Sequence, residues 1–90
     1  MTEEKKAELE FPQEYPFKVF VKPSMVSEEQ LLQVILSLLG RSDCIRKVST
    51  RSSKTKKYLS YTIAVDLKTR AELDSIYAAF KKMDGIPYLL

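Results

Sequence analysis

Histidine, asparagine and tryptophan are all absent from this sequence of 90 residues. Without histidine, the chain lacks the side chain that most often acts as a general base or activates a nucleophile, and imidazole-based metal sites are excluded. No pair of carboxylates stands out as a catalytic acid and its base. The composition therefore favours a protein that is not an enzyme.

Cysteine and glycine are also scarce. Cys44 is the only cysteine, so the chain forms no internal disulfide and has no CxxC metal-binding pair. We expect it to be a small buried apolar side chain. The two glycines, Gly40 and Gly85, are too few and too far apart for a glycine-rich phosphate loop. No metal or cofactor is expected.

Long hydrophobic runs are missing as well. The longest apolar stretch, within LLQVILSLLG, is too short and too interrupted to cross a bilayer. The beginning, MTEEKKAELEF, is polar and acidic and lacks the apolar segment of a signal peptide. Together with the single cysteine, these features predict a cytoplasmic protein with no membrane partner.

Charge is unevenly distributed along the chain, although the net charge is only +3. Residues 1–14 hold five glutamates and two lysines, whereas residues 41–57 hold seven lysines or arginines and one acid, Asp43. We expect residues 1–13 to form a flexible acidic arm and residues 14–90 to form one domain. The basic segment is a candidate interaction surface.

Six segments have the pattern of regular secondary structure. The expected strands cover residues 15–22, 44–53, 57–66 and 86–90, and the expected helices cover residues 27–40 and 69–85. In the first strand, Phe17, Val19 and Val21 share one face. In the third, the shared face holds Leu59, Tyr61, Ile63 and Val65. These two strands are the most apolar and are expected to be central.

Both helices have clear starting signals. Ser27 with Gln30, and Thr69 with Glu72, match the capping box, in which two side chains satisfy each other's free backbone N–H groups. Gly40 is expected just after the first helix and Gly85 at the end of the second. Apolar stripes are expected at Leu31, Leu32, Ile35, Leu38 and Leu39, and at Leu73, Ile76, Tyr77, Phe80 and Met83.

The resulting order, β-α-β-β-α-β, predicts an α+β fold of the ferredoxin-like type. In this arrangement two helices cover one face of a four-stranded antiparallel sheet with the strand order 4-1-3-2. The cationic second strand and the proline-bearing fourth strand then lie at the edges, where charge and proline discourage aggregation. Local pattern and global topology agree.

Four stretches, YPFKVF, SSKTKKYLSYTI, ELDSIY and the terminal IPYLL, resemble the YbeD-like family of small bacterial proteins. The resemblance covers about residues 11–90. It implies an ACT-like, ferredoxin-like fold and a regulatory or binding role, since members are often labelled lipoate-regulatory proteins. It assigns no catalytic residue to this chain.

A basic hairpin is the first candidate site for an anion or a partner. Its residues are Arg46, Lys47, Arg51, Lys54, Lys56, Lys57 and Tyr58. These cations could neutralise the phosphates of a nucleic acid, an acidic protein surface or a small carboxylate ligand. The alternative is that they only solvate a hairpin tip and protect a sheet edge.

The sheet face opposite the helices is the second candidate. We place Lys18, Phe20, Lys22 and Thr62 on it, together with Leu89. Phe20 between two lysines could anchor a partner or a second copy of the chain. Tyr58 and Tyr61 are three residues apart and point to opposite faces, so the spacing does not match the stacking platform of RNA-recognition modules. Phe11 and Tyr15 are expected to pack the arm over this face.

We therefore expect a regulatory or binding module that is not an enzyme and uses the sheet face and basic hairpin. A protein partner or a small effector is favoured, and a homodimer is a further possibility. The alternative function is a nucleic-acid-binding module whose hairpin contacts phosphates without base stacking. A third is a structural subunit of a larger complex.

Overall fold

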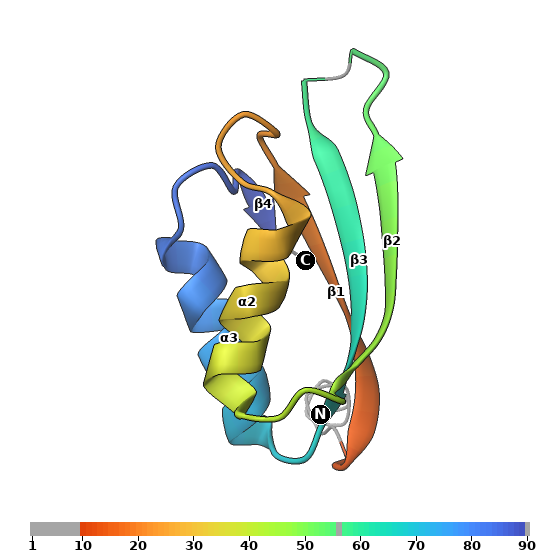
Figure 1. Ribbon diagram of the computed structural model, residues 1–90, viewed down its shortest axis with the longest axis vertical. Coiled ribbons are helices and arrows are strands. Elements are labelled where there is room, and N and C mark those ends of the chain that lie inside the picture. The colour runs from red at the N-terminus through yellow and green to blue at the C-terminus, as the bar shows by residue number, and fades with distance from the viewer. Residues whose placement is uncertain (1–9, 56, 90) are drawn as a thin grey trace, which may run out of the picture.

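The structure is a computed structural model that describes residues 10–55 and 57–89 (Figure 1). Most of the expected acidic arm and the candidate residue Lys56 lie outside these described residues. The elements are β1 (Gln13–Val21), α2 (Glu28–Leu39), β2 (Ile45–Ser52), β3 (Leu59–Leu67), α3 (Arg70–Lys82) and β4 (Tyr88–Leu89). Their order is the one that the sequence predicts.

The four strands form one antiparallel sheet in the order β2-β3-β1-β4. This is the predicted order read from the other edge. Both helices lie on the same side of the sheet, and the hairpin that joins β2 to β3 extends beyond the helix layer (Figure 1). The prediction of a ferredoxin-like α+β fold is confirmed.

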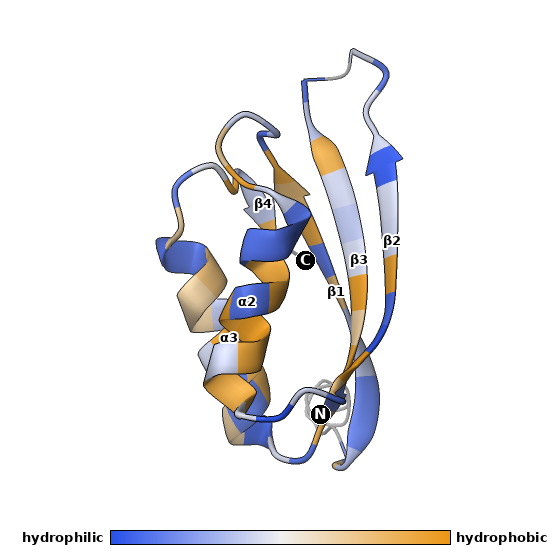
Figure 2. Cartoon of the chain, in the orientation of Figure 1, coloured by the Kyte–Doolittle hydropathy of each residue, from blue (hydrophilic) through white to orange (hydrophobic). Residues whose placement is uncertain are grey.

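The core lies between the helices and the sheet. Strand β1 contributes Phe17, Val19 and Val21, all with no exposed surface. The other fully buried large side chains include Ile63 and Val65 of β3, Leu31 and Ile35 of α2, and Ile76 and Phe80 of α3. In Figure 2 the hydrophobic colour of α2 gathers on the side that faces the sheet. Burial of this apolar surface is the main force that joins the two layers.

Helix α2 begins as expected. The Gln30 backbone N–H donates to Ser27 Oγ, and the Ser27 N–H donates to Gln30 Oε1, so the capping box is complete. Gly40 follows the helix with a φ of 70°, and its N–H donates to the Leu36 carbonyl. One residue of the expected apolar stripe is placed differently, because Leu38 is 44% exposed.

Helix α3 differs from the prediction at both ends. Thr69 Oγ1 accepts the Glu72 N–H as expected, but the Glu72 carboxylate binds the Lys68 N–H and Arg41. The helix ends at Lys82, earlier than expected. Gly85 lies in the following loop with a φ of 92°, where its carbonyl accepts the Lys22 N–H.

Two expectations about the open face of the sheet, the face without helices, are wrong. Tyr15 lies on the helix side, where its ring packs against Phe17 and its hydroxyl bonds Tyr77 at 2.9 Å. Leu89 pairs with the buried Val19 and packs against the core, so Tyr88 is the β4 residue on the open face. In a strand as short as β4, pairing with the neighbouring strand decides which side chains face the core. The sequence of β4 alone does not reveal this.

Candidate binding face

One cross-strand row on the open face joins a cation to two aromatic rings. Arg51 on β2 pairs with Ser60 on β3, and Ser60 pairs with Phe20 on β1. Phe20 pairs in turn with Tyr88 on β4, and the two rings meet edge to face with centroids 6.1 Å apart. Because directly opposed residues in an antiparallel sheet project to the same face, these side chains stand side by side.

The next row adds a second cation and two hydroxyls. Ser49 pairs with Thr62, and Thr62 pairs with Lys18. The Lys18 ammonium lies 5.8 Å from the centroid of the Phe20 ring, within the range of a cation–π interaction. The Lys18 side chain therefore reaches from the polar row towards the aromatic residues. The sequence placed Lys18, Phe20 and Thr62 on this face correctly.

Three adjoining recesses follow these rows towards the hairpin. Their volumes are ≈ 260, ≈ 200 and ≈ 440 Å³. The first is lined by Lys18, Ser49, Thr50, Arg51, Ser60 and Thr62, the second by Lys18, Phe20, Arg51, Ser52, Ser53, Tyr58 and Ser60, and the third by Phe20, Ser53, Tyr58 and Tyr88. Among the residues that the structure describes, no carboxylate lines any of the three. We call this surface the aromatic–cation face.

The base of the hairpin brings Tyr58 to this surface. The Ser53 N–H donates to the Tyr58 carbonyl, and the Tyr58 N–H donates to Ser53 Oγ at 3.2 Å. These bonds close the hairpin below its tip, where Lys54 and Lys57 are exposed. Tyr58 and Arg51 thus join the aromatic–cation face, whereas Lys54 and Lys57 lie beyond it on the tip.

The acidic residues of the open face lie at its other end. Asp66 pairs across the sheet with Glu14, and an irregularity between Ile45 and Lys47 leaves Arg46 without a β3 partner in the register. Arg46 Nε instead donates to Asp66 Oδ2 at 2.6 Å. Arg46, a predicted site residue, therefore forms an ion pair within the molecule. It offsets the charge of Asp66, which lies opposite Glu14 in the register.

The remaining predicted cations are dispersed. Lys47 pairs with Ala64 in the register, one row beyond Ser49, and is exposed. Lys22 follows β1 and is also exposed, and its backbone N–H donates to the Gly85 carbonyl. The structure thus brings together Lys18, Phe20, Arg51, Tyr58 and Thr62. It does not bring all the predicted cations to one point.

Tyr88 is the aromatic residue of this face that the sequence did not identify. It is 65% exposed, and it lines the same recess as Phe20 and Tyr58. The signal that could have placed Tyr88 is the alternation of side chains along β4, combined with the pairing of β4 with β1. If Leu89 faces the core, then Tyr88 must face the opposite side.

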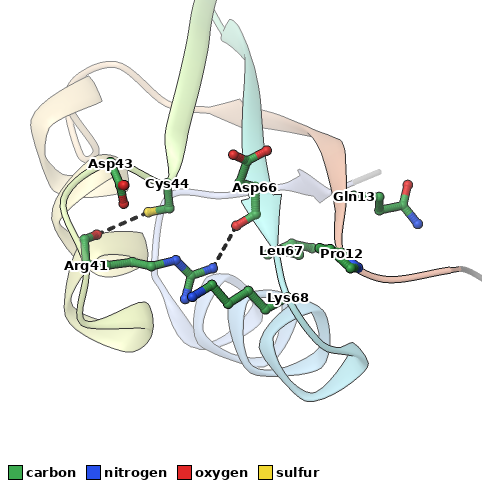
Figure 3. Close-up of a pocket in the computed structure, with 8 residues that line it drawn as sticks. All are labelled: Pro12, Gln13, Arg41, Asp43, Cys44, Asp66, Leu67 and Lys68. Atoms are coloured by element: carbon green, nitrogen blue, oxygen red, sulfur yellow. Dashed lines mark hydrogen bonds between the residues drawn. The ribbon is translucent and has the colours of Figure 1, made fainter.

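A further cavity, of ≈ 480 Å³, lies at the opposite end of the sheet (Figure 3). Arg41 reaches across it, donating to both oxygens of Glu72 at 2.8 and 2.9 Å and to the Asp66 carbonyl at 2.9 Å. The bond from Arg41 lowers the pKa of Glu72 from 4.5 to about 2. With its donors engaged in this way, Arg41 fastens the loop after α2 to the start of α3.

Cys44 lines the same cavity but is only 1% exposed. Its Sγ donates to the Arg41 carbonyl at 3.3 Å (Figure 3), and burial raises the pKa of the thiol. Since the thiolate is the reactive form, this environment disfavours nucleophilic chemistry. The expectation of a buried, apolar cysteine is confirmed.

The described residues also bear on metals and membranes. Within residues 10–55 and 57–89, no three His, Cys, Asp or Glu side chains gather where a metal ion could be held. In the same part of the chain, neither helix is long and apolar enough to cross a membrane.

Comparison with protein families gives a match over residues 6–90 to the family described as "Protein of unknown function (DUF493)". A UPF0250 protein of Nitrosomonas europaea is 29% identical over 90 residues and is aligned over 100% of both chains. A UPF0250 protein of Shewanella piezotolerans is 28% identical over 82 residues, which are 91% of this chain and 90% of that protein.

Solved structures show the same fold at low sequence identity. An H. pylori protein has a TM-score of 0.75 at 18% identity, with 100% of this chain and 93% of that chain covered. The C-terminal domain of the MgtC protein from Mycobacterium tuberculosis has a TM-score of 0.67 at 20% identity, with 92% and 88% covered. The ACT domain from GTP pyrophosphokinase of Chlorobium tepidum has a TM-score of 0.56 at 10% identity, with 87% and 97% covered.

Proposed function

Because this chain belongs to the DUF493 (UPF0250) family, which confirms the YbeD-like resemblance but carries no assigned activity, we propose a function from its geometry. The chain is a binding or regulatory module that is not an enzyme. It takes a protein partner or a small effector on its aromatic–cation face and basic hairpin. We place its action in the cytoplasm, because a single cysteine without a disulfide is typical of a reducing compartment.

One observation supports this proposal above the others. The helices cover one face of the sheet. On the other face three adjoining recesses are lined by rings, hydroxyls and cations, with no carboxylate among the described residues that line them. Small-molecule and peptide sites combine apolar surface with a few polar groups in this way. Charges of one sign also draw an anionic ligand towards the face.

The proposal that the chain is not an enzyme rests on the side chains present. The sequence has no histidine, and its one thiol is buried with a raised pKa. Two of the similar structures are domains of named proteins, MgtC and GTP pyrophosphokinase. A fold found in such domains agrees with a modular role, although fold alone does not identify a ligand.

The test is a comparison of face and control variants in quantitative affinity purification from the native host. We expect the partner or metabolite retained by the wild-type protein to be lost from Arg51→Ala and Tyr88→Ala. Lys82→Ala, which removes an exposed cation from α3, should retain it. Loss with Lys82→Ala and retention with both face variants would place the site on the helix layer and refute the proposal.

A second function is favoured by the exposed cations of the projecting hairpin, Arg51, Lys54 and Lys57. In this function the hairpin contacts the phosphates of a nucleic acid without base stacking. Three or four such contacts predict a slope of about −2 to −4 for log affinity against log salt. The measurement is fluorescence anisotropy of labelled oligonucleotides, and the triple change of Lys54, Lys56 and Lys57 to Ala should abolish binding. Binding that is insensitive to salt would exclude this function.

A further inference from the structure

The chemistry of the aromatic–cation face identifies the kind of ligand that it fits. The recess of ≈ 440 Å³ is bounded by three rings, those of Phe20, Tyr58 and Tyr88, with Ser53 at its side. It lies on the open face of the sheet, and Tyr88 is 65% exposed. Aromatic rings presented on a sheet are surfaces on which the flat face of a nucleic-acid base stacks, and such stacking tolerates any base.

An anion site adjoins this recess. Phe20, Ser53 and Tyr58 also line the neighbouring recess of ≈ 200 Å³, which contains Arg51 and Lys18. Arg51 lies two strands away from Phe20 in the same cross-strand row, a separation of about 10 Å between backbones. A guanidinium and an ammonium at this distance can reach a phosphate attached through a sugar to a base held among the rings.

Polar groups between the two sites suit the rest of such a ligand. The hydroxyls of Ser49, Ser60 and Thr62 line the recesses beside the cations and can donate to or accept from a sugar. Two acidic residues of the open face, Asp66 and Glu14, lie opposite each other in the register at the far end of the sheet. Among the described residues, no carboxylate lines the recesses that contain Arg51 and Lys18.

Two other occupants fit less well. A second copy of the chain, packed face to face, would place Lys18 and Arg51 of each copy against a surface that is also cationic, and like charges in contact oppose association. An acidic peptide would satisfy the cations but gives no reason for a recess whose lining is three aromatic rings and one serine.

We propose that the aromatic–cation face binds a nucleotide unit, with the base among Phe20, Tyr58 and Tyr88 and the phosphate at Arg51 and Lys18. This proposal rests on the face assigned under the proposed function and names the class of its ligand. The unit is either a free nucleotide or part of a single strand, because both present the same base and phosphate.

The direct test is titration of the isotope-labelled protein with adenosine 5′-monophosphate, followed by amide NMR. We expect the amide shifts to gather at Phe20, Ser53, Tyr58 and Tyr88. Adenosine and inorganic phosphate, each tested alone, should bind at least about tenfold more weakly because each contacts only half of the site. Shifts centred on α2 or α3, or inorganic phosphate that binds as tightly as the nucleotide, would overturn the proposal.

Two face variants and two matched controls assign the roles. Tyr88→Ala removes a ring, and Arg51→Ala removes a charge. Each should weaken binding about tenfold, and the dispersed spectrum of the folded protein should be retained because both side chains are exposed. The controls are Leu38→Ala and Lys82→Ala, which remove an exposed apolar side chain and an exposed cation from the helix layer. Equal losses in variants and controls would contradict the assignment.

The source of the unit is determined by repeating the titration with a short single-stranded oligonucleotide at several salt concentrations. Equal affinity per site for the strand and the free nucleotide identifies a free nucleotide. A strand that binds at least tenfold tighter, with a salt slope of about −0.7 for each phosphate contacted, identifies a single-stranded nucleic acid. If neither binds, the nucleotide proposal fails. The proposed function then stands or falls separately on whether Tyr88→Ala and Arg51→Ala lose the cellular partner.

Discussion

The ion pair between Arg41 and Glu72 is expected to make stability depend on pH in acid. The bond from Arg41 holds the pKa of Glu72 at about 2, against 4.5 ordinarily. A carboxyl whose pKa is lower in the folded state contributes its full stabilisation above the unfolded pKa and loses it as pH falls through the folded value. The contribution is therefore complete above about pH 5 and is lost towards pH 2.

The magnitude follows from the same two pKa values. A difference of about 2.5 pKa units corresponds to about 3.5 kcal/mol at about 1.4 kcal/mol per unit. The two side chains are 20% and 21% exposed, so solvent screens part of this interaction. We therefore expect about 1–2 kcal/mol, above the usual contribution of a surface pair because the guanidinium bonds both carboxylate oxygens.

The assay is urea denaturation of the wild type and of Glu72→Gln across the acid range. At pH 6 the variant should be less stable by about 1–2 kcal/mol, and this difference should shrink towards zero near pH 2. Asp74→Asn is the matched control, because it changes an exposed carboxylate of the same helix, and it should alter stability by less than about 0.5 kcal/mol. If Glu72→Gln lowers the free energy of unfolding by the same amount at pH 2 and at pH 6, the ion pair is not the source of the pH dependence.

Two further predictions concern the glycines and the cysteine. Gly85→Ala should cost about 2–4 kcal/mol in the free energy of unfolding, because its φ is 92° and an added Cβ would lie 2.7 Å from Met25 Cβ. Gly40→Ala, with a φ of 70° and no atom within 4 Å of the new Cβ, should cost only about 1 kcal/mol, and thermal unfolding of the two variants checks this order. Cys44 should react with a thiol reagent only at the rate at which the protein opens, because the thiol is 1% exposed and burial raises its pKa. Rapid labelling of the native protein that urea does not accelerate would contradict this.

The sequence predicted the elements whose pattern is long enough to repeat. The alternation of Phe17, Val19 and Val21 and the Ser27–Gln30 capping box both correspond to what the structure contains. Tyr15 continues the same alternation, yet its position beside Pro16 favoured the prediction that it packs the arm over the open face. Its ring meets Tyr77 of α3, a contact between residues 62 positions apart, which local pattern does not reveal.

The candidate site was predicted only in part for a similar reason. Phe20 and Thr62 lie on strands long enough to show their face, whereas Tyr88 belongs to a strand of two residues. Arg46 and Lys47 looked equivalent in the sequence. Both are exposed, but the irregularity in β2 separates their roles: Arg46 forms an ion pair with Asp66, and Lys47 pairs with Ala64 in the register. Such irregularities bend a strand and redirect a side chain, and the sequence of one strand does not locate them.

The shortness of β4 would couple occupancy of the proposed site to local opening of the sheet. Within the described residues, two register pairs, Val19 with Leu89 and Phe20 with Tyr88, attach β4 to β1. Segments held by so few contacts detach more readily than central strands. A ligand that touches Tyr88 binds only molecules in which β4 is attached, so mass action shifts the population towards that state. Occupancy of the face should therefore slow hydrogen exchange at the Tyr88 and Leu89 amides and leave the central strands unchanged, so these two amides report binding.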